Sequence, residues 1–439
     1  MILSQKKNSM NLKLNGMNTT NIGSEMFQWI KDLFPLNRSL TGEPNRLTLR
    51  YLKKILPNLK IGSYASGKKV FDWTIPEEWN VNDAYVLNEK GDKIIDFKVN
   101  NLHLVGYSIP VNQSFSYEEL KEHLHFDQEL ENVIPYRTSY YNKTWGFCLT
   151  YNQFKSLSKS EKYKVRIDSK FSSGELNFGE LIIKGKSNKE ILLSTYICHP
   201  SMANNELSGI AVTVALAKYL SEQKNLFYTY RILFVPETIG SISYLSENLT
   251  EMKNNTTAGF VITCVGDDLN YSFLPSRLGN TYADKVGRFT LDNYTKVYKE
   301  YSFLERGSDE RQYCSPLIDL PVVSIMRSKY GTYKEYHTSA DNLNFISPKG
   351  LEGAYNIYLK AIEILELNKV FTPKIMCEPQ LGKRNLYEIT SNENPNTLIN
   401  LIAYIDGKLD LMDLSKIINE DFFECHIVAQ KLFKNDLIF

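Results

Sequence analysis

Polar residues that can bind a metal or transfer a proton follow several apolar, strand-like runs of the sequence. His199 follows ILLSTYIC, Glu237 follows RILFVP, and Asp267 follows GFVITCVG. His337 comes soon after LPVVSIM. Ligands of open α/β sheets bind beyond the carboxyl ends of the strands, so these side chains are expected to gather at one edge. Each of them alone could equally be a turn or cap residue, and their coincidence at strand ends is what predicts a site.

The residue types at this edge suit a catalytic zinc ion. Imidazole nitrogen and carboxylate oxygen are zinc donors, and a catalytic zinc keeps one coordination position open for water. The chain has six histidines, and two of them fall at this edge. Asn205 and Glu206 begin the helical pattern that follows His199, so they should lie near the same place. A carboxylate beside the metal would then take the proton of the water.

Other kinds of active site find little support in the sequence. Ser208 lacks the G-x-S-x-G pattern of a nucleophile elbow. No Walker A or G-x-G-x-x-G run occurs, which leaves a nucleotide site without a motif. Cys198 and His199 are neighbours on a predicted strand, where side chains alternate between the two faces. We therefore expect these two residues not to form a Cys–His pair.

The pattern of apolar residues divides the chain into four parts that must position these side chains. Residues 19–60 show helical spacing and are expected to join the main domain, while residues 61–161 are short alternating runs typical of an inserted β-rich domain. Residues 162–372 alternate strand-like and helix-like runs, beginning with the strand-like YKVRIDS. They predict an α/β fold with a mixed, mostly parallel sheet flanked by helices. Residues 373–439 have the pattern of a small C-terminal winged-helix domain.

The composition restricts the classes of partner and compartment. The formal net charge of the 439-residue chain is +1, so no global field recruits nucleic acid or an anionic membrane. The winged-helix segment carries seven Lys/Arg and ten Asp/Glu, a net charge of −3, which disfavours phosphate contacts. The six cysteines form no CxxC pair, which argues against a thiolate zinc site or a disulfide framework. Without a secretion signal or a long apolar run, we expect a cytoplasmic protein with no membrane span.

Residues 162–367 resemble the zinc aminopeptidase family often called M28. The family pattern of His, Asp-Asn-x-Ser-Gly, Glu-Glu, Asp, Ser-Asp-His and Tyr-His-Thr is similar here to His199, NELSG, Pro236-Glu237, Asp267, SDE and YHT. The segment EYHTSADNL is the most specific part, and the resemblance implies that its His337 is a metal ligand. Nearly the full chain also resembles a narrower bacterial group with an inserted β domain and a C-terminal winged helix. Segments such as LNRSLTG, FDWTIPEEWN and RGSDERQY carry that second resemblance.

The chain departs from the peptidase pattern at three places in the site, one of which is that Thr263 or Cys264 aligns with the family's third-ligand aspartate and Asp267 follows a few residues later. Asn205 stands where the family has a metal-bridging aspartate, and a neutral amide is a poor bridge between two cations. Glu206, one residue further on, could reach the metal instead. The paired Glu-Glu is replaced by Pro236-Glu237, so Glu237 is either a metal ligand or the general base. These departures favour one zinc ion over two.

The sequence therefore predicts a zinc-dependent hydrolase of amide bonds, an aminopeptidase or an amidase acting on a short peptide or a small N-acyl substrate. The assigned residues are catalytic Glu237, the metal ligands His199, Glu206, Asp267 and His337, and the substrate-binding residues Arg38, Asp309, Arg311 and Tyr336. The alternatives are a catalytically inactive binding protein on a peptidase scaffold and a winged-helix regulatory protein. A homo-oligomer is compatible with all three.

Overall fold

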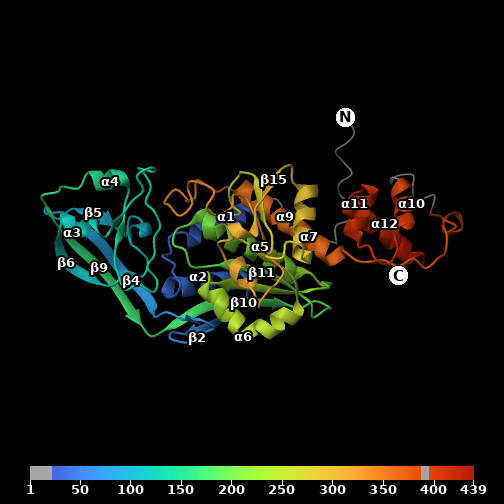
Figure 1. Ribbon diagram of the computed structural model, residues 1–439, viewed down its shortest axis with the longest axis horizontal. Coiled ribbons are helices and arrows are strands. Elements are labelled where there is room, and N and C mark those ends of the chain that lie inside the picture. The colour runs from blue at the N-terminus through green and yellow to red at the C-terminus, as the bar shows by residue number, and fades with distance from the viewer. Residues whose placement is uncertain (1–21, 387–394) are drawn as a thin grey trace.

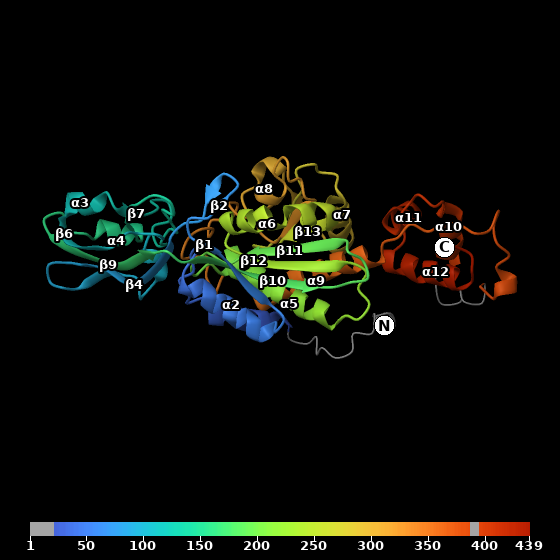
Figure 2. The same ribbon diagram turned by 90° about the horizontal axis from the view of Figure 1, so that it is seen from below.

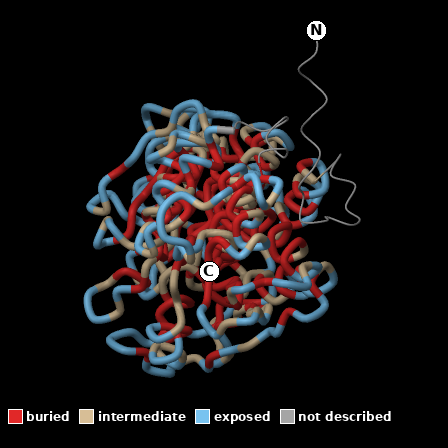
Figure 3. The backbone as a smooth tube through the Cα atoms, turned by 90° about the vertical axis from the view of Figure 1, so that its right-hand side faces the viewer, coloured by how far each residue is buried: buried red, intermediate tan, exposed pale blue. Residues whose placement is uncertain are grey.

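The computed structural model describes residues 22–386 and 395–439. These residues form three parts along the long axis, with a β-rich domain at one end, an α/β domain in the middle and a small helical domain at the other end (Figure 1). Seen along that axis, buried backbone gathers at the centre of the molecule (Figure 3). Two predictions extend outside the described residues: positions 19–21 of the N-terminal helices and positions 387–394 of the C-terminal domain.

The α/β domain is built on an eight-stranded sheet. Its strand order is β1 (Lys60–Ala65), β10 (Glu175–Ile183), β12 (Thr229–Val235), β11 (Glu190–Tyr196), β13 (Thr256–Val261), β16 (Val322–Met326), β14 (Tyr271–Leu274) and β15 (Tyr298–Glu300). The central strands β12, β11, β13 and β16 are parallel to one another. Antiparallel pairs lie toward the edges, at β1 with β10, β10 with β12, and β14 with β16. The predicted mixed, mostly parallel sheet is confirmed.

Helices cover both faces of this sheet because alternate strand residues enter different apolar clusters. On β11, Ile191 and Leu193 belong to one cluster, whereas Leu192 belongs to another. The first cluster includes residues of α1 (Ile22–Leu33), α2 (Glu43–Ile55), α5 (Gly209–Glu222), α7 (Tyr282–Tyr294) and α9 (Pro348–Leu367). The second includes residues of α6 (Ile239–Asn255) and α8 (Glu310–Tyr313). Figure 2 shows α5 and α6 on opposite sides of the strands, which explains the nearly continuous apolar runs of the sequence.

The inserted domain has a separate four-stranded antiparallel sheet, and its apolar side chains form a cluster that also includes Ile239 and Ile242 of α6. The strand order is β5 (Lys93–Asp96), β4 (Glu78–Leu87), β9 (Lys162–Ser172) and β6 (Val111–Ser116). Short elements complete this part of the chain: β2 (Lys69–Val70), β3 (Trp73–Thr74), β7 (Leu124–His125), β8 (Phe147–Cys148), α3 (Tyr117–Lys121) and α4 (Tyr151–Lys155). Its β-rich character agrees with the sequence.

The limits of the insert differ from the predicted 61–161. Strand β9, which the sequence assigned to the α/β sheet, pairs with β4 and β6 of the insert. Strand β1, at the predicted start of the insert, pairs with β10 of the central sheet. The prediction failed here because an alternating strand pattern shows that one face is buried but not which sheet the strand joins.

The C-terminal domain consists of α10 (Pro395–Tyr404), α11 (Leu411–Ile418) and α12 (Phe422–Lys434). It packs on α7 of the α/β domain, where Lys285 Nζ lies 2.6 Å from Asp410 and 2.8 Å from Asp413. The rings of Phe289 and Phe422 make an edge contact at the same junction. This domain lies at the end of the molecule opposite the insert (Figure 1). In the described part of the chain, no helix combines the length and apolar character needed to cross a membrane.

Candidate metal centre

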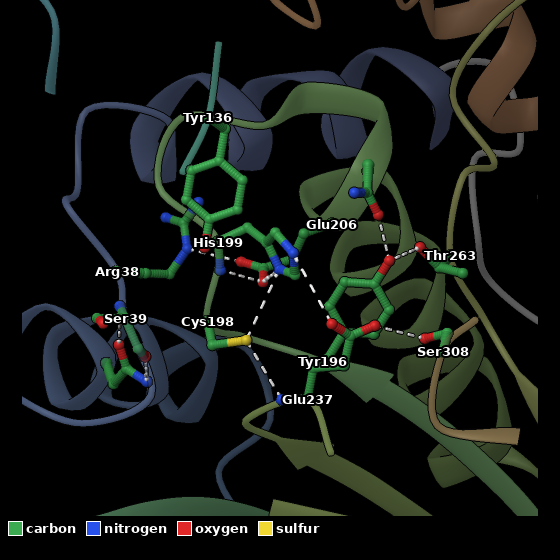
Figure 4. Close-up of polar contacts among 12 residues, drawn as sticks. Arg38, Ser39, Tyr136, Tyr196, Cys198, His199, Glu206, Glu237, Thr263 and Ser308 are labelled. Atoms are coloured by element: carbon green, nitrogen blue, oxygen red, sulfur yellow. Dashed lines mark hydrogen bonds and ion pairs between the residues drawn. The ribbon is translucent and has the colours of Figure 1, made fainter. Parts of the chain in front are cut away.

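His199 lies just beyond the carboxyl end of β11, as the sequence predicts (Figure 4). The strand ends at Tyr196, so the alternation of faces no longer applies to Cys198 and His199. Cys198 Sγ lies 3.7 Å from His199 Nδ1, and the prediction that the two side chains point apart is therefore wrong. Burial raises the pKa of the Cys198 thiol well above its usual range. The contact therefore involves a neutral thiol and not an activated thiolate.

Glu206 supports the His199 ring from its Nδ1 side. Arg38 Nε donates a hydrogen bond to Glu206 Oε1 at 2.8 Å, and both side chains are fully buried. The His199 backbone N–H donates to Glu206 Oε2 at 2.5 Å, and His199 Nδ1 lies 3.2 Å from the same oxygen. This arrangement places the Nδ1 proton toward Glu206 and leaves Nε2 free. It favours a supporting role for Glu206 over the predicted role of metal ligand.

The charge state of His199 follows from these neighbours. Burial alone would lower the pKa of His199, but the hydrogen bond with Glu206 and the negative charges of Glu237 and Glu206 raise it above its usual value. In the metal-free protein, His199 therefore holds a proton more tightly than an exposed histidine does. A metal that binds Nε2 must compete with that proton.

His337 faces His199 across the site, with ring centroids 5.3 Å apart. His337 Nε2 is buried and has no hydrogen-bond partner among the described residues. Burial, together with the neighbouring His199, lowers the pKa of His337 to about 3, so the ring is neutral at physiological pH. A neutral, buried imidazole nitrogen without a partner is available as a metal ligand.

The inserted domain holds the loop that carries His337. The Tyr136 N–H donates to the His337 carbonyl at 2.7 Å. Two residues on, the Ser339 N–H donates to the Ile134 carbonyl at 2.8 Å, and the Ile134 N–H donates to Ser339 Oγ at 2.9 Å. The Tyr136 ring lies 5.3 Å from the His199 ring and 5.1 Å from the His337 ring. An aromatic side chain of the insert therefore contacts both histidines of the site, and Figure 4 shows Tyr136 beside His199.

Glu237 follows β12 at the same edge of the sheet. Ser308 Oγ donates to Glu237 Oε1 at 2.8 Å, while Glu237 Oε2 lies 3.8 Å from His199 Nε2. Burial raises the pKa of Glu237, and the charge of His199 and the hydrogen bond from Ser308 oppose that rise. The Glu237 side chain remains 23% exposed, so solvent reaches it. One ion could contact both His199 Nε2 and Glu237 Oε2, because zinc bonds to nitrogen and oxygen are about 2.0–2.2 Å long.

Asn205 lies on a second side of the site, where the hydroxyl of Tyr196 is hydrogen-bonded to its side-chain amide. Tyr196 OH donates a short hydrogen bond to Asn205 Oδ1 and lies 2.6 Å from Thr263 Oγ1. Thr263 follows the end of β13, at the strand end where the sequence sought a carboxylate ligand. This side therefore presents an amide and two hydroxyls, which are weak ligands for zinc.

Asp267 is held by hydrogen bonds to both of its carboxylate oxygens. Its Oδ2 accepts from Asn204 Nδ2 and from the Ser328 N–H, both at 3.0 Å. Its Oδ1 accepts from the Leu269 N–H at 2.9 Å and from Ser328 Oγ at 3.1 Å. Both carboxylate oxygens are thus used to hold the loop, which differs from the predicted role of metal ligand.

Two of the predicted substrate-binding residues are buried. Arg38 is 1% exposed and is paired with Glu206, so its guanidinium faces the interior and not a substrate carboxylate. Asp309 Oδ1 accepts from the Thr238 N–H at 2.7 Å and from Ser241 Oγ at 2.9 Å, whereas Oδ2 has no partner among the residues described. Burial and the negative charge of Glu237 raise the pKa of Asp309 to about 8. Asp309 is therefore protonated at neutral pH and adds no second negative charge beside Glu237.

The other two predicted substrate-binding residues lie at the rim of the site. Arg311 is exposed, and its Nη2 donates to Thr238 Oγ1 at 2.7 Å. The positive charge of Arg311 lowers the pKa of Glu237 and so opposes the rise caused by burial. The two side chains are therefore close enough for their charges to interact. Tyr336 stacks on His337 with a centroid distance of 3.9 Å.

Sequence reasoning missed two residues that shape the site. Asp341 accepts the backbone N–H groups of Asn204 at 2.6 Å and of Asn205 at 2.8 Å, and so fixes the turn that precedes α5. Its position in EYHTSADNL was a signal that could have identified it. Tyr136 carries no such signal, because it belongs to the insert and reaches the site only through the fold.

Two overlapping groups of side chains could hold a metal. Cys198, His199 and Glu206 offer ligand atoms that all lie within 4.8 Å of one another. Both oxygens of Glu206 are already paired, and the Cys198 thiol is protonated, so this group is poorly prepared for an ion. The group of His199, Glu237 and His337 has a free imidazole nitrogen and a solvent-reachable carboxylate. Among the described residues, the first group has all three ligand atoms within 4.8 Å of one another, whereas the second has the less occupied donor atoms.

Comparisons with known proteins agree with the arrangement of domains. Residues 27–368 match a family described as a domain of unknown function (DUF4910), and residues 369–439 match a winged helix-turn-helix family. A protein of Clostridium acetobutylicum is 43% identical over 429 residues, which cover 96% of this chain and 97% of that protein. That protein is named for an inferred role in polysaccharide biosynthesis and for its aminopeptidase-like domain.

Solved structures extend the comparison to the fold. The crystal structure of an inferred peptidase from Clostridium acetobutylicum has a TM-score of 0.91 at 42% identity, covering 96% of this chain and 97% of that one. A zinc aminopeptidase from Bacillus subtilis has a TM-score of 0.58 at 12% identity, covering 79% and 94%. An aminopeptidase from Aneurinibacillus sp. strain AM-1 has a TM-score of 0.52 at 13% identity, covering 79% and 95%. The last two show likeness of fold alone. This chain belongs to the DUF4910 family and carries a winged helix-turn-helix domain at its C-terminal end.

Proposed function

We propose that this chain is a metal-dependent hydrolase of amide bonds in which His199, Glu237 and His337 hold one zinc ion. The observation that carries the proposal is the buried, unpartnered Nε2 of His337, which faces His199 across the site. Two histidines and one glutamate form a donor set that is found at catalytic zinc sites with an open coordination position. When bound, zinc would polarise the scissile carbonyl and lower the pKa of water.

The relatives support the class of reaction. The Clostridium acetobutylicum protein is named for an aminopeptidase-like domain, and two structural neighbours are aminopeptidases, one of them a zinc enzyme. Aminopeptidases cleave amide bonds. The substrate of this chain is accordingly proposed to be a short peptide or a small N-acyl molecule.

The residues around the proposed ligands keep them in the charge state that a metal needs. Glu206 fixes the His199 ring with Nε2 toward the site, and Tyr136 packs against both imidazoles. Ser308 holds Glu237 Oε1 and leaves Oε2 toward His199. Asp309 stays protonated beneath Glu237, which leaves the negative charge on the ligand carboxylate.

The second side of the site supports one ion over two. Asn205 and Thr263 offer an amide and a hydroxyl, and both are already hydrogen-bonded to Tyr196. Asp267 is held by four hydrogen bonds. A second zinc ion there would have to displace the hydrogen bonds of Asn205 and Asp267.

The test is the substitution Glu237→Gln in the full chain, with zinc content and turnover measured together. The substrates are an aminoacyl p-nitroanilide and an N-acetylated amino sugar. We expect the wild-type chain to bind one zinc ion and to hydrolyse at least one substrate, and the variant to lose both properties. Glu247→Gln on α6, an exposed carboxylate that pairs with Lys68, is the matched control and should retain both. A wild-type chain that takes up no zinc would overturn the proposal.

A non-catalytic binding protein is the second candidate, and one observation favours it. The buried carboxylate of Glu206 is paired with both Arg38 and His199 without any metal. Absence of turnover on both substrate types in zinc-loaded wild-type protein would favour this candidate over the hydrolase.

A further inference from the structure

A second cavity lies where the inserted domain meets the α/β domain, and nothing in the proposed zinc site uses it. The cavity has a volume of about 460 Å³. That size falls within the range of about 300–1,000 Å³ that is usual for small-molecule sites. Its walls come from four segments and from Val81 of β4: the segments are the loop after α1, residues 97–102 of the insert, and the two loops that carry the site histidines.

The cavity adjoins the proposed zinc site through two serines. Ser201 and Ser339 line it, and they follow His199 and His337 by two residues each. Two residues of chain span at most about 7 Å, so both histidines lie close to the cavity wall. A ligand in the cavity could therefore belong to the same molecule as an amide bond at the zinc site.

Apart from one lysine, the polar groups of the described wall residues are uncharged amides and hydroxyls. Asn37, Asn100 and Asn101 line the cavity, and none of the described wall residues is a carboxylate. Lys98, the one cation among them, is paired with Asp83 at 3.1 Å. An anionic ligand such as a phosphate would find a single, already paired ammonium group. The wall is suited to a neutral ligand.

Some of these amides still have hydrogen-bonding capacity. Asn101 Oδ1 is buried without a partner among the described residues. Asn100 uses its oxygen to accept the Leu102 N–H at 3.0 Å. The side-chain amide of Asn37 makes no hydrogen bond to any residue that the structure describes. An asparagine amide both donates and accepts, so it matches a hydroxyl group, which does the same. Unpaired polar groups in a native structure call for a partner.

Apolar side chains complete the wall. Phe34 and Phe97 line the cavity beside the asparagines, and both are partly exposed. Aromatic faces flanked by amides suit a ring that has apolar C–H faces and hydroxyl groups at its edge. We infer that this cavity binds a sugar unit, an uncharged polyhydroxylated ring carried by the substrate of the adjoining site. The link to the substrate rests on the proposed function, whereas binding of the sugar itself needs no metal.

The experiment is saturation-transfer NMR on the full, chelator-treated chain with N,N′-diacetylchitobiose as the probe. We expect transfer to the sugar protons, with Asn37→Ala and Asn101→Leu each weakening the affinity about tenfold through lost hydrogen bonds. Asn112→Ala is the matched control, because Asn112 is exposed on β6 of the insert and does not line the cavity. It should bind the probe as the wild type does. Matching thermal unfolding of the variants guards against loss of fold, and Asn37→Ala is the milder change.

A separate arm uses glycylglycine under the same conditions. Transfer to the dipeptide that is sensitive to Asn101→Leu, with none to the disaccharide, would assign the cavity to peptides and overturn the inference. The inference would also fall if the disaccharide showed no transfer at about 10 mM, which is weaker than specific small-molecule binding, or if both cavity variants bound it as the wild type does. A chain without zinc or turnover would refute the proposed function alone and leave the sugar result intact.

Discussion

The two sides of the candidate site are built from the same sheet edge, yet they are in opposite states. On the side of His199, Glu237 and His337, one imidazole nitrogen has no partner and one carboxylate oxygen faces another ligand atom. On the side of Asn205 and Asp267, hydroxyls, amides and backbone N–H groups satisfy the polar atoms. The difference separates a side that has an unpaired donor atom from a side whose polar atoms are already hydrogen-bonded.

That contrast explains why the sequence departures occur together. With Asn205 in place of a carboxylate, the second side has one carboxylate fewer, and Tyr196 OH pairs with the amide instead. A second ion there would have to displace the hydrogen bonds of Asn205 and Asp267. The predictions below test each side of the proposed one-ion site in turn.

The largest effect is expected from His337→Ala. Removal of the unpartnered imidazole deletes a proposed ligand, so zinc affinity should fall by more than about 100-fold, beyond the effect of a supporting residue. Competition with a fluorescent zinc chelator measures this change. His426→Ala on α12 is the control, since His426 bonds Gln430 in the C-terminal domain. Unchanged zinc affinity in His337→Ala would show that His337 is not a zinc ligand and that this side of the site does not hold an ion through it.

Glu206→Gln should have the next largest effect, because it weakens the hold on His199 and leaves Arg38 as an unpaired buried charge. We expect zinc affinity to fall about 10–100-fold and the free energy of unfolding to fall by about 3–5 kcal/mol. The control is Glu190→Gln, which breaks the buried pair with Arg231 on β12, far from the proposed ligands. It should destabilise the protein but leave the zinc affinity of the folded chain unchanged. Equal zinc affinity in both variants would make Glu206 a purely structural residue.

Zinc affinity should depend on pH through His199. Its raised pKa means that zinc must displace a proton below that pKa, so affinity should fall about tenfold per pH unit there. His337, with a pKa of about 3, should contribute nothing above pH 5. The linked effect on stability has the opposite sign for His199. The metal-free chain is stabilised below the unfolded pKa and loses that stability as pH rises through the folded pKa.

Calorimetric zinc titrations across pH, in buffers of different protonation enthalpy, measure the protons released. Release of about one proton per zinc ion below the pKa of His199 is expected. Release of about two protons would mean that a second ligand, Glu237 or His337, is also protonated in the metal-free protein, and the same titration on Glu237→Gln separates the two.

The smallest effect on zinc is expected from Asp267→Asn, on the closed side. The substitution keeps the shape but loses part of four hydrogen bonds, so the free energy of unfolding should fall by about 1–3 kcal/mol while zinc affinity stays the same. Thermal unfolding and the chelator competition together measure the two quantities. A clear loss of zinc affinity would restore Asp267 as the ligand that the sequence predicted.

Sequence patterns bring His199 and Glu237 together because both residues stand directly at strand ends, whereas His337 lies well after the end of β16 and is held by its pairing with the insert. His199 and Glu237 follow β11 and β12, and the strand end alone brings them together. Sequence patterns failed where position depends on hydrogen bonding beyond the strand. The side chain of Glu206 is oriented by a hydrogen bond from Arg38, which lies far away in the sequence, after α1. The side chain of Asp267 is oriented by hydrogen bonds from Asn204 and Ser328.

The contribution of the insert was beyond the reach of sequence patterns. Tyr136 meets His337 through a backbone pairing between segments that are about 200 positions apart, and no local pattern encodes such a contact. The same limit explains why β9 was assigned to the wrong sheet. The fold class was nevertheless correct, because buried strands and amphipathic helices are local signals.

The zinc stoichiometry of the full-length wild-type chain tests the central claim most directly. The measurement is an isothermal titration of metal-free protein with zinc at neutral pH, checked by metal analysis after gel filtration. The one-ion account predicts a single tight site, with His199, Glu237 and His337 as its ligands. Two tight ions would show that the side of Asn205 and Asp267 is also a metal site, and no tight ion would show that neither side is.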